Sequence, residues 1–122
     1  MAKRHLTYVC SGCPVEAALE IIGAKWKGGT LFNLLAGERR FSELRRLMPN
    51  VTQRILSKAL RELEADGLIL RTVYPTVPPQ VGYRLTDKGE ALRPAILALR
   101  GWGIDHLKTS APEAEPLPVA AE

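Results

Sequence analysis

Two cysteines near the N-terminus have the spacing of a redox pair. Cys10 and Cys13 form a Cys-x-x-Cys motif, and thiols at this spacing can exchange between dithiol and disulfide. Cys13 precedes Pro14 at the predicted start of a helix, where unpaired amides and the helix dipole favour the reactive thiolate. Disulfide oxidoreductases place the motif after a strand in a βαβ unit, which this sequence does not predict. In a reducing compartment, both residues can equally be free thiols without a function.

Two further patterns suggest enzyme or metal chemistry but are incomplete. Residues 23–30, GAKWKGGT, approach the phosphate-binding pattern G-x-x-x-x-G-K-[ST], but Gly29 stands where the lysine is required. The segment also follows a helical pattern instead of a strand. His5, Cys10 and Cys13 are suitable metal ligands, but the set lacks a fourth. We therefore expect no catalytic residues, no metal and no cofactor, and the chain is not predicted to be an enzyme.

A helix with one basic and polar face indicates a different function. Thr52 is the predicted N-cap of this helix, and Gly67 is its predicted left-handed C-cap. At 100° per residue one arc is apolar and consists of Ile55, Leu56, Ala59, Leu60 and Leu63. The opposite arc consists of Gln53, Arg54, Ser57, Lys58 and Arg61. Arg and Lys donate to guanine edges or phosphates, and Gln can pair with adenine, so this face suits the major groove of DNA.

The preceding segment completes a helix-turn-helix pattern. Ser42 is the predicted N-cap of a first helix, which Pro49 ends, and Asn50 can take a left-handed conformation in the corner. The apolar side chains that this helix is predicted to bury are Phe41, Leu44 and Leu47. Ser42 and Arg45 on this helix, together with Thr52, are further predicted DNA contacts.

Basic charge is concentrated in these two helices. The chain has a net charge of +4, whereas residues 39–61 contain seven basic side chains and one acidic one, a net of +6. Binding of a polyanion such as DNA there would be favoured by the release of its counterions. The alternative is a solvated amphipathic helix in which Lys58 pairs with Glu62 one turn further on.

A β-hairpin is predicted after the second helix. Residues 68–74 and 81–85 are rich in β-branched and aromatic side chains, and prolines stiffen the loop between them. Gln80 at the end of this loop is a predicted DNA contact. A helix pair followed by a hairpin is a winged helix-turn-helix, so the fold class is mainly α with a small β-hairpin.

These residues resemble the HxlR-type regulators, a branch of the MarR-like winged-helix transcription factors. The matching stretches are residues 13–27, residues 39–92 and the pair Trp102-Gly103, and the resemblance covers residues 13–107. It implies a homodimer that binds a near-palindromic DNA operator and represses a nearby gene. In several such proteins the cysteine that matches Cys13 senses oxidants or electrophiles, sometimes through a bond between subunits, and Cys10 would be a resolving partner.

The chain departs from the family pattern at four positions. Gln80 stands where the family usually has a basic wing residue, and Gly82 stands where a Glu is common. Gly28 and Gly29 replace bulky apolar residues, which predicts a helix that is either loosened or closely packed.

The terminal helices carry apolar stripes that exceed the needs of one small core. One helix follows Pro14, and a last helix is predicted to begin at the N-cap Thr86 and to bend at Pro94. The predicted dimer-interface residues on the two helices are Leu19, Ile22, Ile96, Leu99 and Trp102. The alternative is that these residues complete the core of the monomer.

The expected organisation is an N-terminal arm (1–12), a winged helix-turn-helix domain with dimerisation helices (13–108) and a disordered acidic tail (109–122). The sequence has no long apolar stretch, so we expect a cytoplasmic protein without a membrane segment. The leading function is a DNA-binding transcriptional regulator, most simply a repressor responsive to an oxidant or electrophile. The alternative is a winged helix used for protein association.

Overall fold

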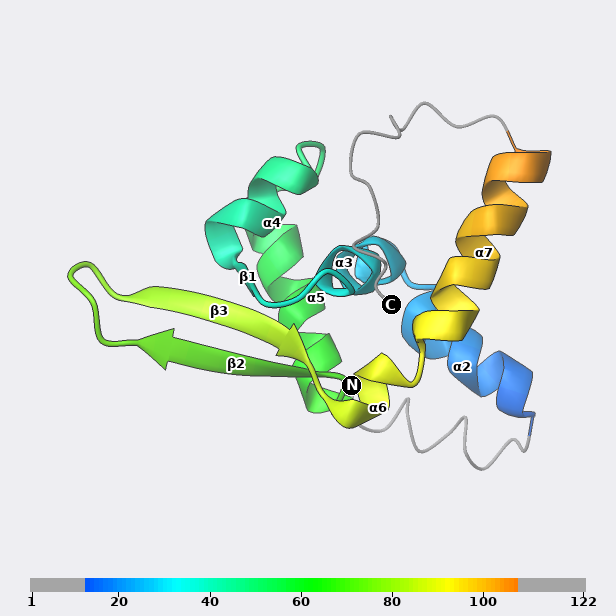
Figure 1. Cartoon of the computed structure of the whole chain (residues 1–122), viewed down its shortest axis with the longest axis horizontal. Coiled ribbons are helices and arrows are strands. Elements are labelled where there is room, and N and C mark those ends of the chain that lie inside the picture. Colours follow the sequence, from blue (N-terminus) through cyan, green and yellow to red (C-terminus); the bar gives the residue numbers. More distant parts are fainter. Residues whose placement is uncertain (1–12, 108–122) are drawn as a thin grey trace.

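The computed structural model describes residues 13–107, which form a group of helices with a small antiparallel sheet at one side (Figure 1). The three strands pair in the order β1-β3-β2. In chain order the elements are α2 (Pro14–Ile22), α3 (Lys27–Leu34), β1 (Arg39–Arg40), α4 (Phe41–Leu47), α5 (Gln53–Ala65), β2 (Ile69–Tyr74), β3 (Gln80–Leu85), α6 (Asp87–Glu90) and α7 (Arg93–His106). The predicted arm and tail, and with them Cys10 and His5, lie outside the described residues.

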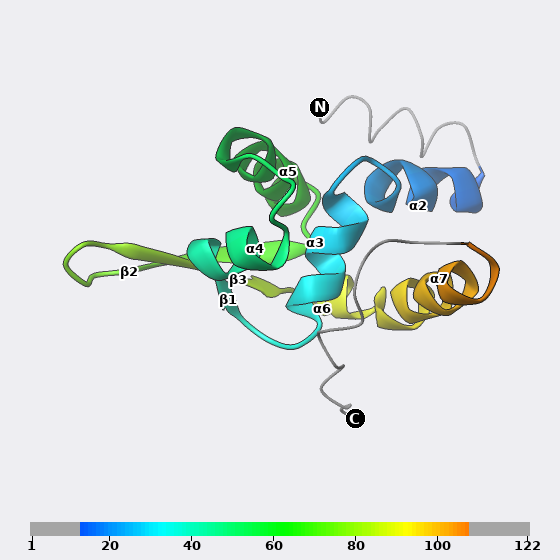
Figure 2. The same cartoon turned by 90° about the horizontal axis from the view of Figure 1, so that it is seen from above.

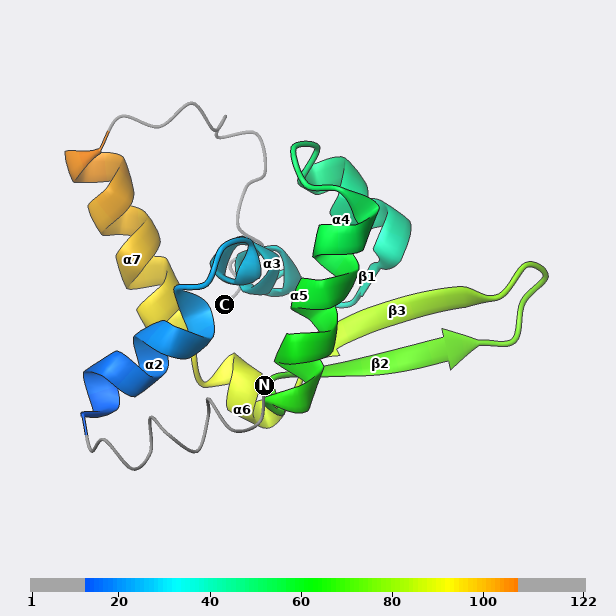
Figure 3. The ribbon, with the colours of Figure 1, turned by 180° about the vertical axis from the view of Figure 1, so that it is seen from behind.

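The hairpin and the terminal helices lie at opposite ends of the molecule. The β2–β3 hairpin projects away from the helices, whereas α2 and α7 lie at the far end (Figures 1 and 2). Between them lie α3, α4 and α5, and the view from behind shows α5 running along the base of the hairpin (Figure 3). This arrangement of a helix pair and a projecting hairpin is the predicted winged helix-turn-helix fold.

The core lies where α3, α4 and α5 meet the base of the sheet. Its most completely buried apolar residues are Leu31, Leu34, Leu44, Leu56, Leu60, Leu63, Leu68 and Ile69. The apolar arc predicted for the second helix is therefore largely confirmed. Ile55 is the exception, because 42% of it is exposed although its neighbour Leu56 is fully buried.

The start of α4 differs from the sequence prediction. The N-cap is Arg40, not Ser42, so the helix begins one residue before the predicted cap. The reason is Glu43, whose Oε1 accepts a hydrogen bond of 2.7 Å from the amide of Arg40 and so fixes the chain direction at that residue. Ser42 is an exposed residue of the first turn.

The corner between α4 and α5 also differs in detail. Asn50 is not left-handed, because the amide of Val51 bonds to the carbonyl of Met48 at 3.1 Å and closes a turn with Pro49 and Asn50 in its centre. Proline suits the second position of type I turns, in which both central residues have negative φ. The predicted N-cap of α5 is confirmed, because the hydroxyl of Thr52 accepts from the amide of Ile55 at 3.1 Å. The C-cap is Asp66, one residue before the prediction, and Gly67 follows it in the predicted left-handed conformation with a φ of 79°.

The hairpin matches its prediction to within one residue at either end. In the register of β2 and β3, Ile69 lies opposite Leu85 and Tyr74 lies opposite Gln80. A third strand was not predicted. β1 is only two residues long and pairs Arg40 with Gly82 on β3.

The predicted last helix is divided into two. Thr86 caps the short α6 by accepting a bond of 3.1 Å from the amide of Gly89, and α7 begins afresh at Arg93. Pro94 therefore lies in the first turn of α7 and does not bend the helix, since a residue in that turn needs no amide donor. Neither α7 nor any other helix between residues 13 and 107 has the length and apolar character to cross a membrane.

Candidate DNA-binding surface

The polar face of α5 is open to solvent. Gln53, Arg54, Lys58 and Arg61 are exposed and Ser57 is half-buried, while the opposite face of the helix packs on the core. Thr52 at the N-cap is also exposed. The predicted DNA contacts on this helix therefore form one accessible surface.

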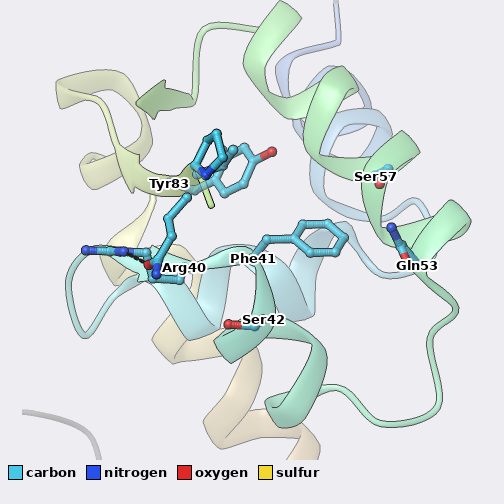
Figure 4. Close-up of a pocket in the computed structure, with 9 residues that line it drawn as sticks. Arg40, Phe41, Ser42, Gln53, Ser57 and Tyr83 are labelled. Atoms are coloured by element: carbon cyan, nitrogen blue, oxygen red, sulfur yellow. Dashed lines mark hydrogen bonds between the residues drawn. The ribbon is translucent and has the colours of Figure 1, made fainter. Parts of the chain in front are cut away.

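A hollow of about 470 Å³ separates this surface from the hairpin. It brings together four predicted contacts from three parts of the chain, namely Ser42 on α4, Gln53 and Ser57 on α5, and Gln80 on β3. Figure 4 shows the ring of Phe41 pointing from the start of α4 toward Gln53 and Ser57. The hollow is lined by hydrogen-bonding side chains around an aromatic floor, which suits a sugar-phosphate backbone that passes between helix and wing.

A second hollow, of about 420 Å³, flanks α5 further along the hairpin. Its lining residues are Ser57, Arg61, Glu64, Arg71 and Tyr83. Arg61 and Arg71 are exposed and place positive charge on both sides of the opening. The polar face of α5 thus continues to Arg71 on β2.

Arg40 is a candidate contact that the sequence analysis did not select. Its guanidinium lies 4.7 Å from the centre of the Tyr74 ring and donates to the side chain of Gln80, so three elements hold it in place at the edge of the larger hollow. The phenol of Tyr74 in turn donates to the carboxylate of Glu38. The available sequence signal was Gly82, because a residue without a side chain in a strand indicates a close approach by another group.

The hydrogen bond to Glu38 raises the pKa of Tyr74 above its ordinary value of 10.0. Partial burial and the negative charge of Glu38 act in the same direction, while Arg40 and Arg84 oppose them. The donor in this bond is the neutral phenol, so the bond is present throughout the neutral pH range.

Four predicted DNA contacts do not line either hollow. Arg54 and Lys58 lie on the open face of α5, Thr52 is its exposed N-cap, and Arg45 is half-buried on α4. Lys58 does approach Glu62, with Nζ 4.0 Å from Oε2, but 69% of its side chain is exposed. Both the DNA-contact and the solvated-helix interpretations are compatible with this geometry.

The end opposite the wing exposes large apolar side chains. Leu19 on α2 and Leu99 and Trp102 on α7 are about half exposed, at 50%, 52% and 56%. Ile22 and Ile96 differ from the sequence prediction, because both are buried in the chain's own core. For these two residues, the alternative interpretation as monomer core is the one observed.

Cys13 is the N-cap of α2. Its Sγ accepts a contact of 3.5 Å from the amide of Glu16, and the residue is half-buried. At the other end of α2, a Cβ on Gly28 would lie 3.1 Å from the carbonyl oxygen of Ile22, so Gly28 allows α3 to pack closely on α2. A change at Cys13 would therefore act on a helix that is in direct contact with the next one.

The fold and this surface define a winged helix-turn-helix protein of the DNA-binding type. The model of the HxlR-like helix-turn-helix family matches residues 21–111, and the chain belongs to this family. The chain is 55% identical over 92 residues to the uncharacterized HTH-type transcriptional regulator YdeP of Bacillus subtilis (strain 168), covering 75% of this chain and 72% of YdeP. The family comprises DNA-binding transcriptional regulators and not enzymes.

Solved structures of a redox regulator have the same fold. The oxidized form of the redox regulator HypR has a TM-score of 0.75 and 47% identity, covering 80% of this chain and all of HypR. The reduced form has a TM-score of 0.73 and 48% identity, covering 76% of this chain and 92% of that chain.

Proposed function

We propose that this chain binds a near-palindromic DNA operator as a homodimer and represses transcription of a nearby gene. The observation that carries the proposal is the exposed polar face of α5 beside the hairpin, with two hollows between helix and hairpin that share Ser57 and Tyr83. In this arrangement α5 enters the major groove, and Arg54 and Lys58 contact base edges or phosphates. Arg40 and Gln80 contact the backbone where it leaves the groove. Repression is the mode of action that the family resemblance favours.

Dimerisation through α2 and α7 explains the apolar end of the molecule. Leu19, Leu99 and Trp102 are about half exposed in the protomer, and apolar side chains gathered at one end of a molecule favour association. A two-fold axis at that end places the two copies of α5 on one side of the dimer. Their separation then selects half-sites about one helical turn apart, or a multiple of it.

Oxidation of Cys13 is the proposed signal. Peroxide oxidises a thiolate to a sulfenic acid, which condenses with a second thiol to a disulfide and releases water. Cys10 or a cysteine of the second protomer would provide that thiol. Because α2 packs closely on α3 and contributes to the proposed interface, a bond at Cys13 would alter the separation of the two reading helices. The likeness to a redox regulator solved in two forms supports this proposal.

The deciding experiment is selection of duplexes from a random-sequence library by the purified protein. Enrichment of a near-palindrome, with affinity that falls steeply as salt rises, is the expected result. Light scattering of the complex should give two chains per duplex. Protein association without specific DNA binding, the competing function, predicts that no sequence is enriched.

A further inference from the structure

A buried lysine lies behind the proposed DNA-reading helix. Lys27, the first residue of α3, is only 1% exposed, and its ammonium lies 2.7 Å from Oε1 of Glu62 on α5. The side chain of Glu62 is itself only 14% exposed. A lysine is rarely buried so completely without a partner, because removal of an ammonium from water is costly unless a close opposite charge offsets it. The ion pair therefore joins α3 to the helix that carries the proposed DNA contacts.

The same carboxylate also approaches the exposed face of α5. Oε2 of Glu62 lies 4.0 Å from Nζ of Lys58, one helical turn earlier. Without Lys27, the full charge of this carboxylate would attract the ammonium of Lys58 and hold it against the helix. With Lys27 at 2.7 Å, the charge of Glu62 is balanced from inside the protein.

We propose that Lys27 is a positioning residue for DNA binding, which neutralises Glu62 so that Lys58 stays free to contact DNA. The inference rests on the proposed role of α5, and it goes further because Lys27 is buried and cannot itself touch DNA. If Lys27 served only to pack α3 against α5, its removal would change stability and leave the contribution of Lys58 intact. Under the proposal, the effect of Lys27 on DNA affinity passes through Lys58.

The test is a double-mutant cycle between Lys27 and Lys58. Lys27→Gln removes the charge but retains a donor to Glu62, and Lys25→Gln is the matched control, because it removes the same charge from an exposed side chain two residues away. Each change is made in the wild-type and in the Lys58→Ala background. The probe is the duplex that the wild-type protein selects from a random-sequence library, and thermal melting gives the folded fraction. Lys27→Gln should weaken binding about fivefold in the wild-type background and leave it unchanged in the Lys58→Ala background.

Each outcome separates this inference from the proposed function. An equal loss in both backgrounds, or no loss beyond that of Lys25→Gln, overturns the role of Lys27. No effect of Lys58→Ala itself overturns both this inference and the placement of Lys58 on DNA, and failure to select any duplex rejects the DNA-binding proposal as a whole.

If Lys27→Gln does not fold, Glu62→Gln decides. Part of the attraction remains in the wild type, because Oε2 of Glu62 still lies 4.0 Å from Nζ of Lys58. Loss of the carboxylate should therefore raise affinity about twofold, and only while Lys58 is present. An unchanged affinity rejects the proposal.

Discussion

The carboxylate of Glu38 occupies the space that a side chain at Gly82 would need. A Cβ on Gly82 would meet Oε2 of Glu38, and it would lie 3.1 Å from Cε2 of Tyr74. Because that space is open, Glu38 accepts the hydrogen bond of the Tyr74 phenol, and the Tyr74 ring supports the guanidinium of Arg40. Because Gly82 has no side chain, Glu38 and Arg40, which precede α4, can both contact Tyr74 and support the outer part of the hairpin.

Gly82→Ala is expected to destabilise the fold and weaken DNA binding together. The added methyl group displaces Glu38 and the Tyr74 ring, and such overpacking costs about 1–3 kcal/mol of unfolding free energy. Denaturant unfolding measures this loss. Glu38→Ala in the same chain makes room for the methyl group, so the double variant should regain most of the stability. If the double variant is less stable than Gly82→Ala alone, the close approach of Glu38 is not the cause.

The hydrogen bond between Tyr74 and Glu38 predicts a titration at alkaline pH. The pKa of Tyr74 is raised above 10.0 in the folded chain, so the stability that this bond contributes is fully present below about pH 10 and is lost as pH rises through the folded-state pKa. Tyrosinate absorbance, compared between wild type and Tyr74→Phe, isolates this residue. Glu38→Gln should lower the midpoint of the Tyr74 titration. A midpoint that is the same in wild type and Glu38→Gln contradicts the assignment.

Local sequence patterns predict α5 and the β2–β3 hairpin, because the residues that begin, end and fill each element lie close together in the chain. Thr52 and Gly67 mark the ends of α5, and its apolar positions recur with the period of a helix. The exposure of Ile55 depends on how neighbouring elements pack, and propensity alone does not contain that information. The N-cap at Arg40 follows from its local hydrogen bond with Glu43, and arginine is not among the side chains that favour this position. The separation of α6 from α7 was missed because Thr86 and Pro94 each suit a helix start.

The sequence predicts the kind of site, a DNA-contact face on α5, but not every residue that belongs to it. The alternation of polar and apolar residues identified the contacts on α5, whereas Arg40 belongs to the surface only through its partners on the hairpin. The sequence around Lys27 resembles only an incomplete phosphate loop. The burial of Lys27 against Glu62 follows from how α3 packs on α5, which no local spacing encodes.

Arg54→Ala and Lys58→Ala should each weaken binding to the selected duplex by about 1–3 kcal/mol if they reach base edges. Thermal stability should change little, because both side chains are exposed. Fluorescence anisotropy on the selected and on scrambled duplexes measures the effect on specificity. Arg45→Ala should weaken both duplexes alike, and Lys25→Ala serves as the control for loss of one charge. If Arg54→Ala and Lys58→Ala both keep full affinity, α5 is not the helix that contacts the bases.

Leu99→Asp and Trp102→Asp should convert a dimer into a monomer that remains folded. Both side chains are about half exposed in the protomer, so the new charge meets an apolar surface only when a second copy binds, at a cost of at least about 2 kcal/mol. Ile96→Asp is the contrasting change, because Ile96 is buried in the protomer and the substitution should unfold it. Sedimentation and circular dichroism distinguish these effects. A wild type that is monomeric at micromolar concentration would remove the basis of the prediction.

Oxidation at Cys13 should change the affinity of the wild-type protein for its selected duplex, because Cys13 caps the helix that packs on α3 and contributes to the proposed interface. Peroxide or a quinone is added before the titration, and a reductant is added afterwards to test for reversal. Cys13→Ser should bind DNA normally and be insensitive to either compound. Cys10→Ser should keep part of the response and lose reversible disulfide formation. Non-reducing gels then separate a bond between protomers from a bond within one chain.

If both cysteines are inert free thiols, the titrations before and after treatment will coincide. An equal response of wild type and Cys13→Ser would exclude sensing at Cys13, while DNA binding through α5 would be unaffected.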